Sequence, residues 1–355
     1  MTNKKVSALI VDDSPLVREV LSDIISSDDE LKLVGTACDP FEAVQIIQKS
    51  VPDVITLDIE MPKMDGITFL KKIMSQHPIP VIVLSSHTAS NKQLALKAFE
   101  NGALYVMNKP EVEDKKSFLE YSGRLCELIK MAGNQSGFQK SNLKIKKTHS
   151  ETEINTNLSR LQQLVKTRPE LIAIGASAGG TMAIQSILTK LKGKTPPIVI
   201  TQHMPVGFTK EFALRLNRLS GLEVCESEGN EFLQAGHVYI APGDKHLRVI
   251  RQGGKLKTEI FDGDLVNHHK PAVDVMFESV ATSCKSTSIA FLLTGMGRDG
   301  AQGLLSIKKH GGFTLAQDKK TSVVYGMPAE AMRIGAAFEE IPLDHIGPLI
   351  TKFIN

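Results

Sequence analysis

Short apolar runs alternate with segments of helical period along the whole chain, and this alternation restricts the fold more than any other feature. In the first half, five runs rich in Val, Ile and Leu have the length of strands: Ala8–Asp12, Leu31–Gly35, Val54–Asp58, Pro80–Ser86 and Leu104–Lys109. Amphipathic segments such as Pro15–Ile25 and Pro40–Lys49 separate them. Strands that alternate with helices predict a five-stranded parallel sheet covered on both faces.

The second half repeats this alternation and adds a hairpin. Its strand-like runs are Leu171–Gly175, Pro197–His203, His237–Pro242 and Ser288–Gly295. Between His246 and Ile260, two alternating runs flank the pair Gly253-Gly254, which is typical of a tight antiparallel turn. We therefore expect a doubly wound, mostly parallel α/β sheet with an added antiparallel hairpin.

A chain of 355 residues suits two domains, each with its own core. Residues 132–147 are rich in Gly, Asn, Gln and Ser and then in Lys, without a sustained apolar period, and a short helix is expected over 155–165. The predicted division is a first domain over 1–130, a linker over 131–167 and a second domain over 168–355.

Composition excludes several classes of protein. Seven basic residues oppose two acidic ones between residues 139 and 168, a larger surplus than the net charge of +3 of the whole chain, so a solvated linker is favoured over a nucleic-acid-binding arm. The four cysteines lack C-x-x-C spacing, which disfavours zinc and disulfides. No apolar stretch approaches the roughly 18 residues of a membrane helix, and no signal peptide is apparent, so we expect a cytoplasmic protein without membrane insertion.

Five polar side chains lie where strands of the first half end: Asp12, Asp13, Asp58, Ser85 and Lys109. The carboxyl ends of parallel strands meet at one edge of the sheet, so these side chains should converge. Three close carboxylates repel one another unless a hard divalent cation with oxygen ligands, such as Mg²⁺, lies between them. One aspartate at a strand end would more often be a helix cap. Five polar side chains, each at a strand end and in this order, favour a phosphate site in which Lys109 and Ser85 contact the phosphate oxygens.

The motifs around these residues are VDDS, LDIEMPKMDG, LSS and NKP. Over about the first 125 residues they resemble the receiver domain of bacterial two-component response regulators, which implies a flavodoxin-like fold. The resemblance also implies these roles: Asp58 as phosphoacceptor, Asp12 and Asp13 with Asp58 and the Glu60 backbone as Mg²⁺ ligands, Ser85 as switch hydroxyl, and Lys109 as phosphate contact. Receiver domains have an aromatic switch residue three positions before the lysine, but this chain has Val106 there. Tyr105 is its neighbour in the strand and should therefore point to the opposite face of the sheet.

In the second half, Ser177 lies between a strand and a helix in the sequence Gly-Ala-Ser-Ala-Gly-Gly. Small neighbours permit a tight turn that exposes the hydroxyl at a helix N-terminus, where free N–H groups can stabilise an oxyanion. The competing interpretation is a phosphate-binding loop, but neither the G-x-G-x-x-G spacing nor a following Lys-Ser/Thr is present. The pattern favours a nucleophile.

Two further strand ends supply partners for this serine. His203 ends the next strand, and Asp299 lies in a glycine-rich turn after Ser288–Gly295. A histidine at a strand end is more often structural, but beside a candidate nucleophile it predicts a general base that Asp299 would orient. The Met296 N–H is a candidate oxyanion donor. The chain order Ser, His, Asp differs from that of the α/β-hydrolases.

The second half carries the motifs GASAGG, TQHMP, YIAPGDKH, HHKPAVDVMF, LLTGMGRDGA and VVYGMP. Over roughly residues 168 to 350 it resembles the chemotaxis protein-glutamate methylesterases, which commonly have Thr or Ser where this chain has Ala178. The resemblance implies a phosphorylation-regulated serine hydrolase that removes methyl esters from glutamates of methyl-accepting chemotaxis receptors, releases methanol, deamidates receptor glutamines and needs no cofactor for the esterase. A chemotaxis histidine kinase would donate phosphate, and receptor clusters at the inner membrane surface would recruit the chain.

Some alternatives stay open at this point. His268, His269 and Asp274 form a second polar cluster whose spacing fits no strong zinc pattern, so a substrate-cleft or structural role is favoured, with Asp274 as the fallback for the third triad member. A receiver can also precede a DNA-binding domain, but a strand-rich second half of this length disfavours one. The remaining alternative is a scaffold or phosphate sink with an inactive hydrolase domain.

Overall fold

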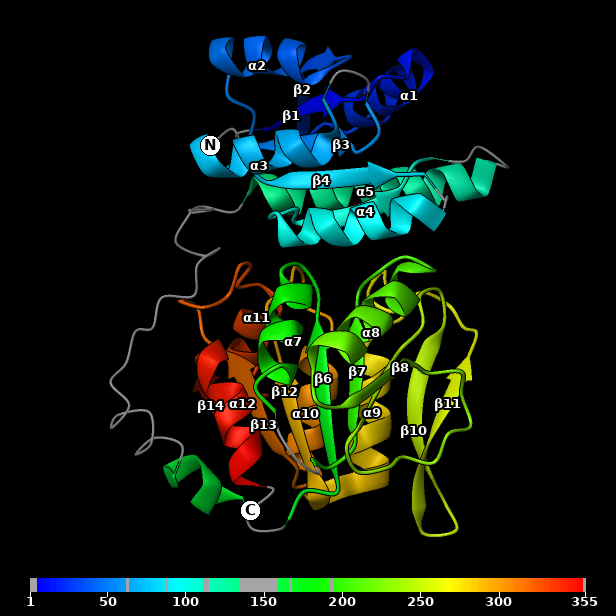
Figure 1. Ribbon diagram of the computed structural model, residues 1–355, viewed down its shortest axis with the longest axis vertical. Helices are drawn as coiled ribbons and strands as arrows, with labels where there is room; N and C mark the ends of the chain where they lie inside the picture. The colour runs from blue at the N-terminus through cyan, green and yellow to red at the C-terminus, as the bar shows by residue number, and fades with distance from the viewer. Residues whose placement is uncertain are drawn as a thin grey trace. The chain divides into compact units, whose positions relative to one another are not determined.

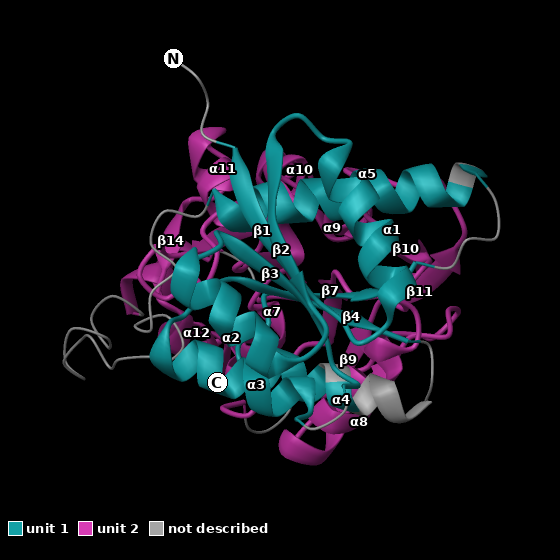
Figure 2. Ribbon diagram, turned by 90° about the horizontal axis from the view of Figure 1, so that it is seen from above, with its two compact units in different colours: residues 1–143 teal, residues 144–355 magenta. Residues whose placement is uncertain are grey.

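The structure is a computed structural model that describes residues 5–61, 64–86, 89–110, 115–134, 159–165, 168–191 and 195–353. The chain divides into two compact units, residues 1–143 and 144–355 (Figure 2). Most of the expected linker, residues 135–158 and 166–167, lies outside the described residues. Residues 159–164 are helical and belong to the helix expected over 155–165.

The first unit is a five-stranded, all-parallel sheet in the order β2-β1-β3-β4-β5 (Figure 1). Its strands are β1 (Val6–Val11), β2 (Leu31–Ala37), β3 (Val54–Asp58), β4 (Val81–Ser85) and β5 (Tyr105–Asn108). Its helices are α1 (Pro15–Ser26), α2 (Pro40–Lys49), α3 (Gly66–Gln76), α4 (Ala89–Glu100) and α5 (Lys115–Gly133). The predicted five-stranded parallel sheet is confirmed, with helices α1 and α5 on one face and α2, α3 and α4 on the other (Figure 2).

Local sequence explains where these helices begin. Ser14 caps α1 by accepting a hydrogen bond from the Val17 N–H, and Asp39 caps α2 by accepting from two backbone N–H groups of its first turn. A proline follows each cap, where its missing N–H costs nothing. The chain therefore turns from strand to helix close to each strand end, which keeps the strand-end side chains at the edge of the sheet.

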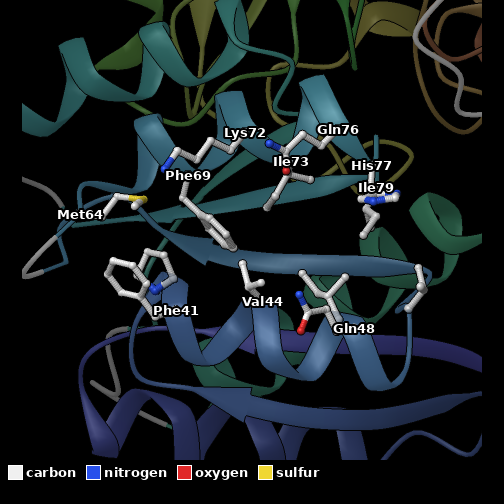
Figure 3. A pocket seen from close by; sticks show the side chains of 13 residues that line it. Phe41, Val44, Gln48, Met64, Phe69, Lys72, Ile73, Gln76, His77 and Ile79 are labelled. Carbon is white, nitrogen blue, oxygen red and sulfur yellow. The ribbon is translucent and has the colours of Figure 1, made fainter.

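A cavity of about 460 Å³ lies between α2 and α3 (Figure 3). Apolar side chains from both helices line it, among them Val44, Phe69 and Ile73, and Lys72 and Gln76 add polar groups. None of the five residues expected to bind phosphate is part of its lining. The cavity is therefore separate from the predicted phosphate site.

The second unit has a seven-stranded sheet in the order β14-β13-β12-β6-β7-β9-β8, and every neighbouring pair is parallel. Its strands are β6 (Leu171–Ala176), β7 (Ile198–Gln202), β8 (Glu223–Glu226), β9 (His237–Ile240), β12 (Ser288–Leu292), β13 (Phe313–Gln317) and β14 (Glu339–Ile341). Its helices are α7 (Gly180–Leu188), α8 (Phe208–Leu219), α9 (Val273–Cys284), α10 (Ala301–Lys309), α11 (Met327–Arg333) and α12 (Leu343–Lys352), with a short 3₁₀ turn at Lys285–Thr287.

The predicted hairpin is confirmed. Strands β10 (His246–Gln252) and β11 (Lys255–Phe261) pair antiparallel around Gly253-Gly254, whose two positive φ angles of 57° and 80° are those of a tight hairpin turn. The hairpin forms a two-stranded sheet of its own and packs on α9. It is therefore added beside the main sheet and leaves that sheet wholly parallel.

Two layers of helices explain why the central strands are apolar along their whole length. Helices α7, α8 and α12 cover one face of the main sheet and α9, α10 and α11 the other (Figure 1), so β6 and β12 are buried at every residue. The largest side chains of the resulting core include Phe277 and Phe291, both fully buried. Within the described residues, no helix has the length and apolar character required to cross a bilayer.

Candidate active site

The acidic side chains of the first unit meet at the carboxyl edge of its sheet. Asp12 and Asp13 directly follow β1, and Asp58 is the last residue of β3, on either side of the point where the strand order reverses. One carboxylate oxygen from each of the three lies within 4.8 Å of the others. Lys109, directly after β5, places Nζ 2.8 Å from Asp12 Oδ2 and 2.8 Å from Asp58 Oδ2.

Electrostatics at this cluster are those of a crowded, partly desolvated anionic site. Burial raises the pKa of Asp58 to about 6, against the opposing ammonium of Lys109 and with the charge of Asp12 adding to the increase. Burial alone would lower the pKa of Lys109, but its bonds to the two carboxylates hold it above the ordinary value. Lys109 thus places its ammonium between Asp12 and Asp58, and three carboxylates that each offer a hard oxygen ligand fit Mg²⁺.

The other residues expected in the phosphate site are placed as follows. The Glu60 N–H donates to Asp58 Oδ1 over 3.1 Å, so the backbone of Glu60 lies at the cluster. Ser85 is buried at the end of β4, but its hydroxyl donates to the Ser86 carbonyl at 3.4 Å and contacts neither Asp58 nor Lys109. Its role as switch hydroxyl stays a prediction.

The structure also places the two residues at the expected switch position. Val106 is fully buried in β5, and Tyr105 is buried beside it with its hydroxyl accepting a hydrogen bond from Arg124 of α5. Successive residues of a strand face opposite sides of the sheet. The aromatic ring at residue 105 is therefore tied to the α5 side, and Val106 occupies the other.

In the second unit, Ser177 follows β6 directly and its backbone is held on three sides. Its N–H donates to the Thr294 carbonyl (3.1 Å), and its carbonyl accepts from the Gly180 N–H (2.8 Å) and from Gln202 Nε2 (2.9 Å). Gly179 has φ of 75°, and a Cβ there would lie 2.6 Å from Val323 Cβ, so glycine is required for the turn into α7. The Ser177 hydroxyl is buried and makes no hydrogen bond within the described part of the chain.

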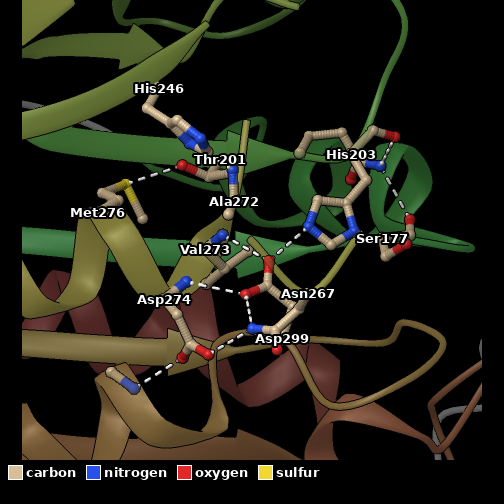
Figure 4. Close-up of polar contacts among 12 residues, drawn as sticks. Ser177, Thr201, His203, His246, Asn267, Ala272, Val273, Asp274, Met276 and Asp299 are labelled. Atoms are coloured by element: carbon tan, nitrogen blue, oxygen red, sulfur yellow. Dashed lines mark hydrogen bonds and ion pairs between the residues drawn. The ribbon is translucent and has the colours of Figure 1, made fainter. Parts of the chain in front are cut away.

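His203 follows β7, the neighbour of β6, and contacts an aspartate. Its Nε2 lies 2.8 Å from Asp299 Oδ2, and both side chains are 1% exposed. The opposite edge of the imidazole faces Ser177 (Figure 4), and Nδ1 there makes no hydrogen bond to any described residue. Because an ionised carboxylate can only accept, the neutral ring carries its proton on Nε2 and leaves Nδ1 free as a base. The two nitrogens are thus placed in the opposite way to those of the usual serine-protease triad, in which Nδ1 contacts the aspartate.

Asp299 is fixed by the start of helix α9 as well as by His203. The Val273 N–H donates to Oδ2 over 2.6 Å and the Asp274 N–H to Oδ1 over 3.1 Å (Figure 4). Burial alone would raise the pKa of Asp299, but the hydrogen bond and Coulombic interaction with His203, then the Coulombic interaction with His269 and the hydrogen bond from Asn267, lower it to about 2. The carboxylate therefore stays ionised across the whole physiological range and is held in one orientation.

Asp274, the fallback for this position, lies in the same network but does not touch His203. It accepts hydrogen bonds from the Gly303 N–H (2.7 Å) and from Asn267 Nδ2 (2.7 Å). Burial and the nearby charge of Asp299 raise its pKa to about 6. The geometry thus favours Asp299 over Asp274 as the partner of His203.

The loop before α9 contributes residues that inspection of the sequence underestimated. The His269 ring stacks on His203 with a centroid distance of 3.6 Å and an interplanar angle of 21°. Asn267 bonds both aspartates, although it was not among the candidate residues. An amide does not titrate, so only the preference of Asn for the central positions of tight turns indicates this residue in the sequence.

The turn after β12 contains Met296, whose N–H is the candidate oxyanion donor. Met296 is buried in the turn after β12, and its N–H donates to no backbone acceptor among the described residues. The neighbouring Gly295 packs so closely that a Cβ there would lie 2.8 Å from Ser177 Cβ.

Within the described residues, the acidic cluster of the first unit is the one group of three or more potential metal ligands close enough to share an ion, and His268, His269 and Asp274 do not form another.

Comparisons with known proteins identify a family for each half of the chain. Residues 8–118 match the family model "Response regulator receiver domain", and residues 172–350 match "CheB methylesterase". A relative from Vibrio vulnificus named protein-glutamate methylesterase/protein-glutamine glutaminase 2 is 45% identical, with all of both chains covered. A relative of that function from Escherichia coli is 42% identical over 96% of this chain and 95% of its own.

Among solved structures, the CheB methylesterase catalytic domain of Thermotoga maritima is similar to 52% of this chain and to 99% of its own, at 40% identity and a TM-score of 0.51. Similarity to a catalytic domain solved by itself agrees with the division of this chain into two units. From the two family matches and the full-length relatives, we conclude that the chain belongs to the protein-glutamate methylesterase/protein-glutamine glutaminase family and combines a receiver domain with a CheB methylesterase domain.

Proposed function

We propose that this chain is a phosphorylation-regulated serine hydrolase of chemotactic adaptation. It removes methyl esters from glutamate side chains of methyl-accepting chemotaxis receptors, releases methanol and deamidates receptor glutamines. Its full-length relatives carry the name of both activities. The single observation that carries the proposal is the contact of His203 with Asp299 on one side of the ring while the other side faces Ser177 (Figure 4).

The esterase reaction begins with attack by Ser177 Oγ on the ester carbonyl as His203 Nδ1 takes the hydroxyl proton. Asp299 stabilises the imidazolium that forms. The Met296 N–H is the proposed donor to the developing oxyanion, and donors of this kind contribute roughly 10² to 10³ in kcat.

His203 then returns its proton to the leaving group. Methoxide leaves poorly unless it is protonated, and general acid–base help of this type contributes roughly 10² to 10⁴ in rate. Water, activated by the same imidazole, hydrolyses the acyl-enzyme. An amide carbonyl enters the same sequence with ammonia as the leaving group, so one site serves both ester hydrolysis and glutamine deamidation.

In the receiver, Asp58 is the proposed nucleophile towards the phosphoryl group. Mg²⁺ bound by Asp12, Asp13, Asp58 and the backbone of Glu60 would neutralise the charge that gathers between carboxylate and phosphate. Lys109, which bridges Asp12 and Asp58, is within reach of a phosphate oxygen at Asp58, and Ser85 would rotate to take another. A chemotaxis histidine kinase is the proposed donor, and receptor clusters at the inner face of the cytoplasmic membrane the proposed place of action.

Methylated receptor membranes are expected to release methanol when incubated with the chain, and acetyl phosphate with Mg²⁺ is expected to increase the rate. The reason is that phosphorylation of the receiver relieves a restriction on access to Ser177. A chain lacking residues 1–165 should then exceed the unphosphorylated full-length chain. Gas chromatography of methanol tests the esterase, and ammonia release tests the deamidase. No methanol under any condition would contradict the proposed activity, and a truncated chain no faster than the unphosphorylated whole would contradict the proposed regulation.

Asp58→Asn is expected to abolish covalent labelling by radioactive acetyl phosphate in the presence of Mg²⁺, because an amide cannot form the acyl phosphate. Methanol release should then no longer respond to acetyl phosphate. Asp29→Asn is the matched control, since Asp29 is an exposed aspartate between α1 and β2. Undiminished labelling of the Asp58 variant would reject the assignment.

A further inference from the structure

The amide of Asn267 lies between the two aspartates of the catalytic domain. Its Nδ2 donates to Asp274 Oδ2 over 2.7 Å and to Asp299 Oδ1 over 2.9 Å (Figure 4). An amide nitrogen carries two protons, so one can be given to each carboxylate.

The backbone around Asn267 is built to present this amide. Val266 and His269 exchange two backbone hydrogen bonds of 3.1 and 2.9 Å, so Asn267 and His268 are the central residues of a tight turn. Their φ angles are 51° and 64°, a region that costs most residues energy but that asparagine tolerates. Strain of this kind persists where neighbouring contacts hold the backbone in place, and it gathers at functional sites.

With Asn267, the Asp299 carboxylate has four donors, two on each oxygen. His203 Nε2 and the Val273 N–H bond Oδ2, while Asn267 and the Asp274 N–H bond Oδ1. Rotation of the carboxylate away from His203 would break several of these bonds at once. Asn267 is the one donor among the four that a substitution can remove without altering the helix backbone or His203.

We propose that Asn267 is a positioning residue for the esterase reaction: its amide holds Asp299 against His203 and separates the Asp299 and Asp274 charges, so that Nδ1 of His203 stays aimed at Ser177. The inference rests on the proposed function. Asn267 carries no charge itself, but it donates to both carboxylates of the network to which His203 belongs. His269, next to the same turn, adds a ring stack that restrains the plane of the His203 imidazole.

The titratable groups in and beside this network include His203, His268, His269, Asp274 and Asp299. Glu278 lies one turn along α9, and Nδ1 of His246 accepts from the Ala272 N–H. A third carboxylate at position 267 would replace the donor by a negative charge next to two others. Like charges favour the protonated forms of all of them and the charged form of a nearby imidazole.

Two substitutions at this position distinguish the effect of the amide hydrogen bonds from the effect of the turn conformation. Asn267→Gly keeps the positive φ and loses both hydrogen bonds, and we expect kcat to fall roughly tenfold to a hundredfold, with KM within about twofold, because bonds to charged groups are lost. Asn267→Asp keeps the size and shape of the side chain but replaces its N–H donor by a negatively charged acceptor. We expect a larger loss of kcat and an acid limb of the pH profile about one pH unit higher. Asn267→Gly adds no charge, so it is the discriminating variant: if Asn267 only maintained the fold, this variant would lose stability while its folded fraction kept the wild-type kcat.

The measurements are methanol release and the rate of Ser177 labelling by a fluorophosphonate, both as functions of pH on the full chain. Asn230→Gly and Asn230→Asp are the matched controls, because Asn230 has φ of 68° in the same domain, is exposed and lies outside the network. They should match the wild type in both assays. Asn267→Gly keeps the test valid if Asn267→Asp fails to fold, since glycine relieves the strain of the turn.

The outcomes distinguish the inference from the proposed function. If both Asn267 variants keep wild-type kcat, labelling rate and pH profile while Ser177→Ala is inactive, the positioning role is wrong and the esterase assignment stands. If the wild type releases no methanol but its fluorophosphonate labelling depends on Asn267 as described, the receptor ester is wrong as substrate and the positioning role stands.

Discussion

Ser177→Ala is expected to lower kcat for methanol release by roughly 10⁴- to 10⁶-fold, with KM little changed, because the attacking oxygen is removed while the site around it stays intact. Stability should not suffer. The hydroxyl makes no hydrogen bond within the described residues, and the backbone bonds to Thr294, Gly180 and Gln202 do not depend on it. Removal of an unsatisfied buried hydroxyl should leave the melting temperature equal to that of the wild type or slightly above it.

The measurement combines methanol release with labelling by a fluorophosphonate probe and a thermal melt. Ser220→Ala, at the end of α8, is the matched control and should retain both activity and labelling. Methanol release by the Ser177 variant at a rate close to the wild type would show that another group attacks the ester.

Asp299→Asn is expected to lower kcat by roughly 10⁴-fold, equivalent to about 5.5 kcal/mol of transition-state stabilisation. The asparagine amide donates to Nε2 of His203, which forces the ring proton onto Nδ1 and removes the base that faces Ser177. Two backbone donors of α9 also lose a charged acceptor, so unfolding of the catalytic domain should become easier by about 1–3 kcal/mol.

Asp274→Asn is the comparison that decides between the two aspartates, and its kcat should stay within about tenfold of the wild type. Asp274 bonds Gly303 and Asn267 and has no contact with His203. A loss at Asp274 as large as that at Asp299 would reject the assignment of the triad.

The same two aspartates have opposite pH signatures in stability. The pKa of Asp299 is lowered to about 2, so its contribution is present above pH 3.8 and is lost as pH falls towards 2. The pKa of Asp274 is raised to about 6, so the folded state holds a proton there that the unfolded state has released, and this contribution is lost as pH rises from 3.8 to 6. Denaturant titrations of the two asparagine variants between pH 3 and pH 7 should therefore differ from the wild type in opposite directions.

Sequence inspection predicted most of the fold because parallel strands covered on both faces are apolar along their whole length. Runs such as Leu171–Gly175 and Ser288–Gly295 correspond to β6 and β12, buried at every residue. The caps Ser14 and Asp39 mark helix starts that local sequence also predicts. The hairpin was predicted from Gly253-Gly254, but the fact that it pairs with no strand of the main sheet depends on its packing against α9.

The candidate site was predicted where side chains follow strand ends, because the carboxyl edge of a parallel sheet gathers them whatever their separation in the chain. This reasoning predicts Ser177, His203 and Asp299, as well as Asp12, Asp58 and Lys109. In the structure His203 contacts Asp299, and Lys109 contacts both Asp12 and Asp58. Side-chain orientation was not predictable: Ser85 is at the expected strand end but its hydroxyl points to Ser86. Asn267 was not predicted because the carboxylates to which it donates are 7 and 32 residues away in sequence.

By itself, the sequence determined two parallel α/β units and the residues that stand at the ends of their strands, since hydrophobic period and turn chemistry act over short stretches of chain. Only the tertiary structure decided that Asp299, and not Asp274, contacts His203, which imidazole nitrogen faces Ser177, and that Asn267 bonds both carboxylates. Those choices depend on hydrogen-bond geometry at a scale of about 3 Å, and that geometry is set when helix α9, its preceding loop and the turn after β12 pack together.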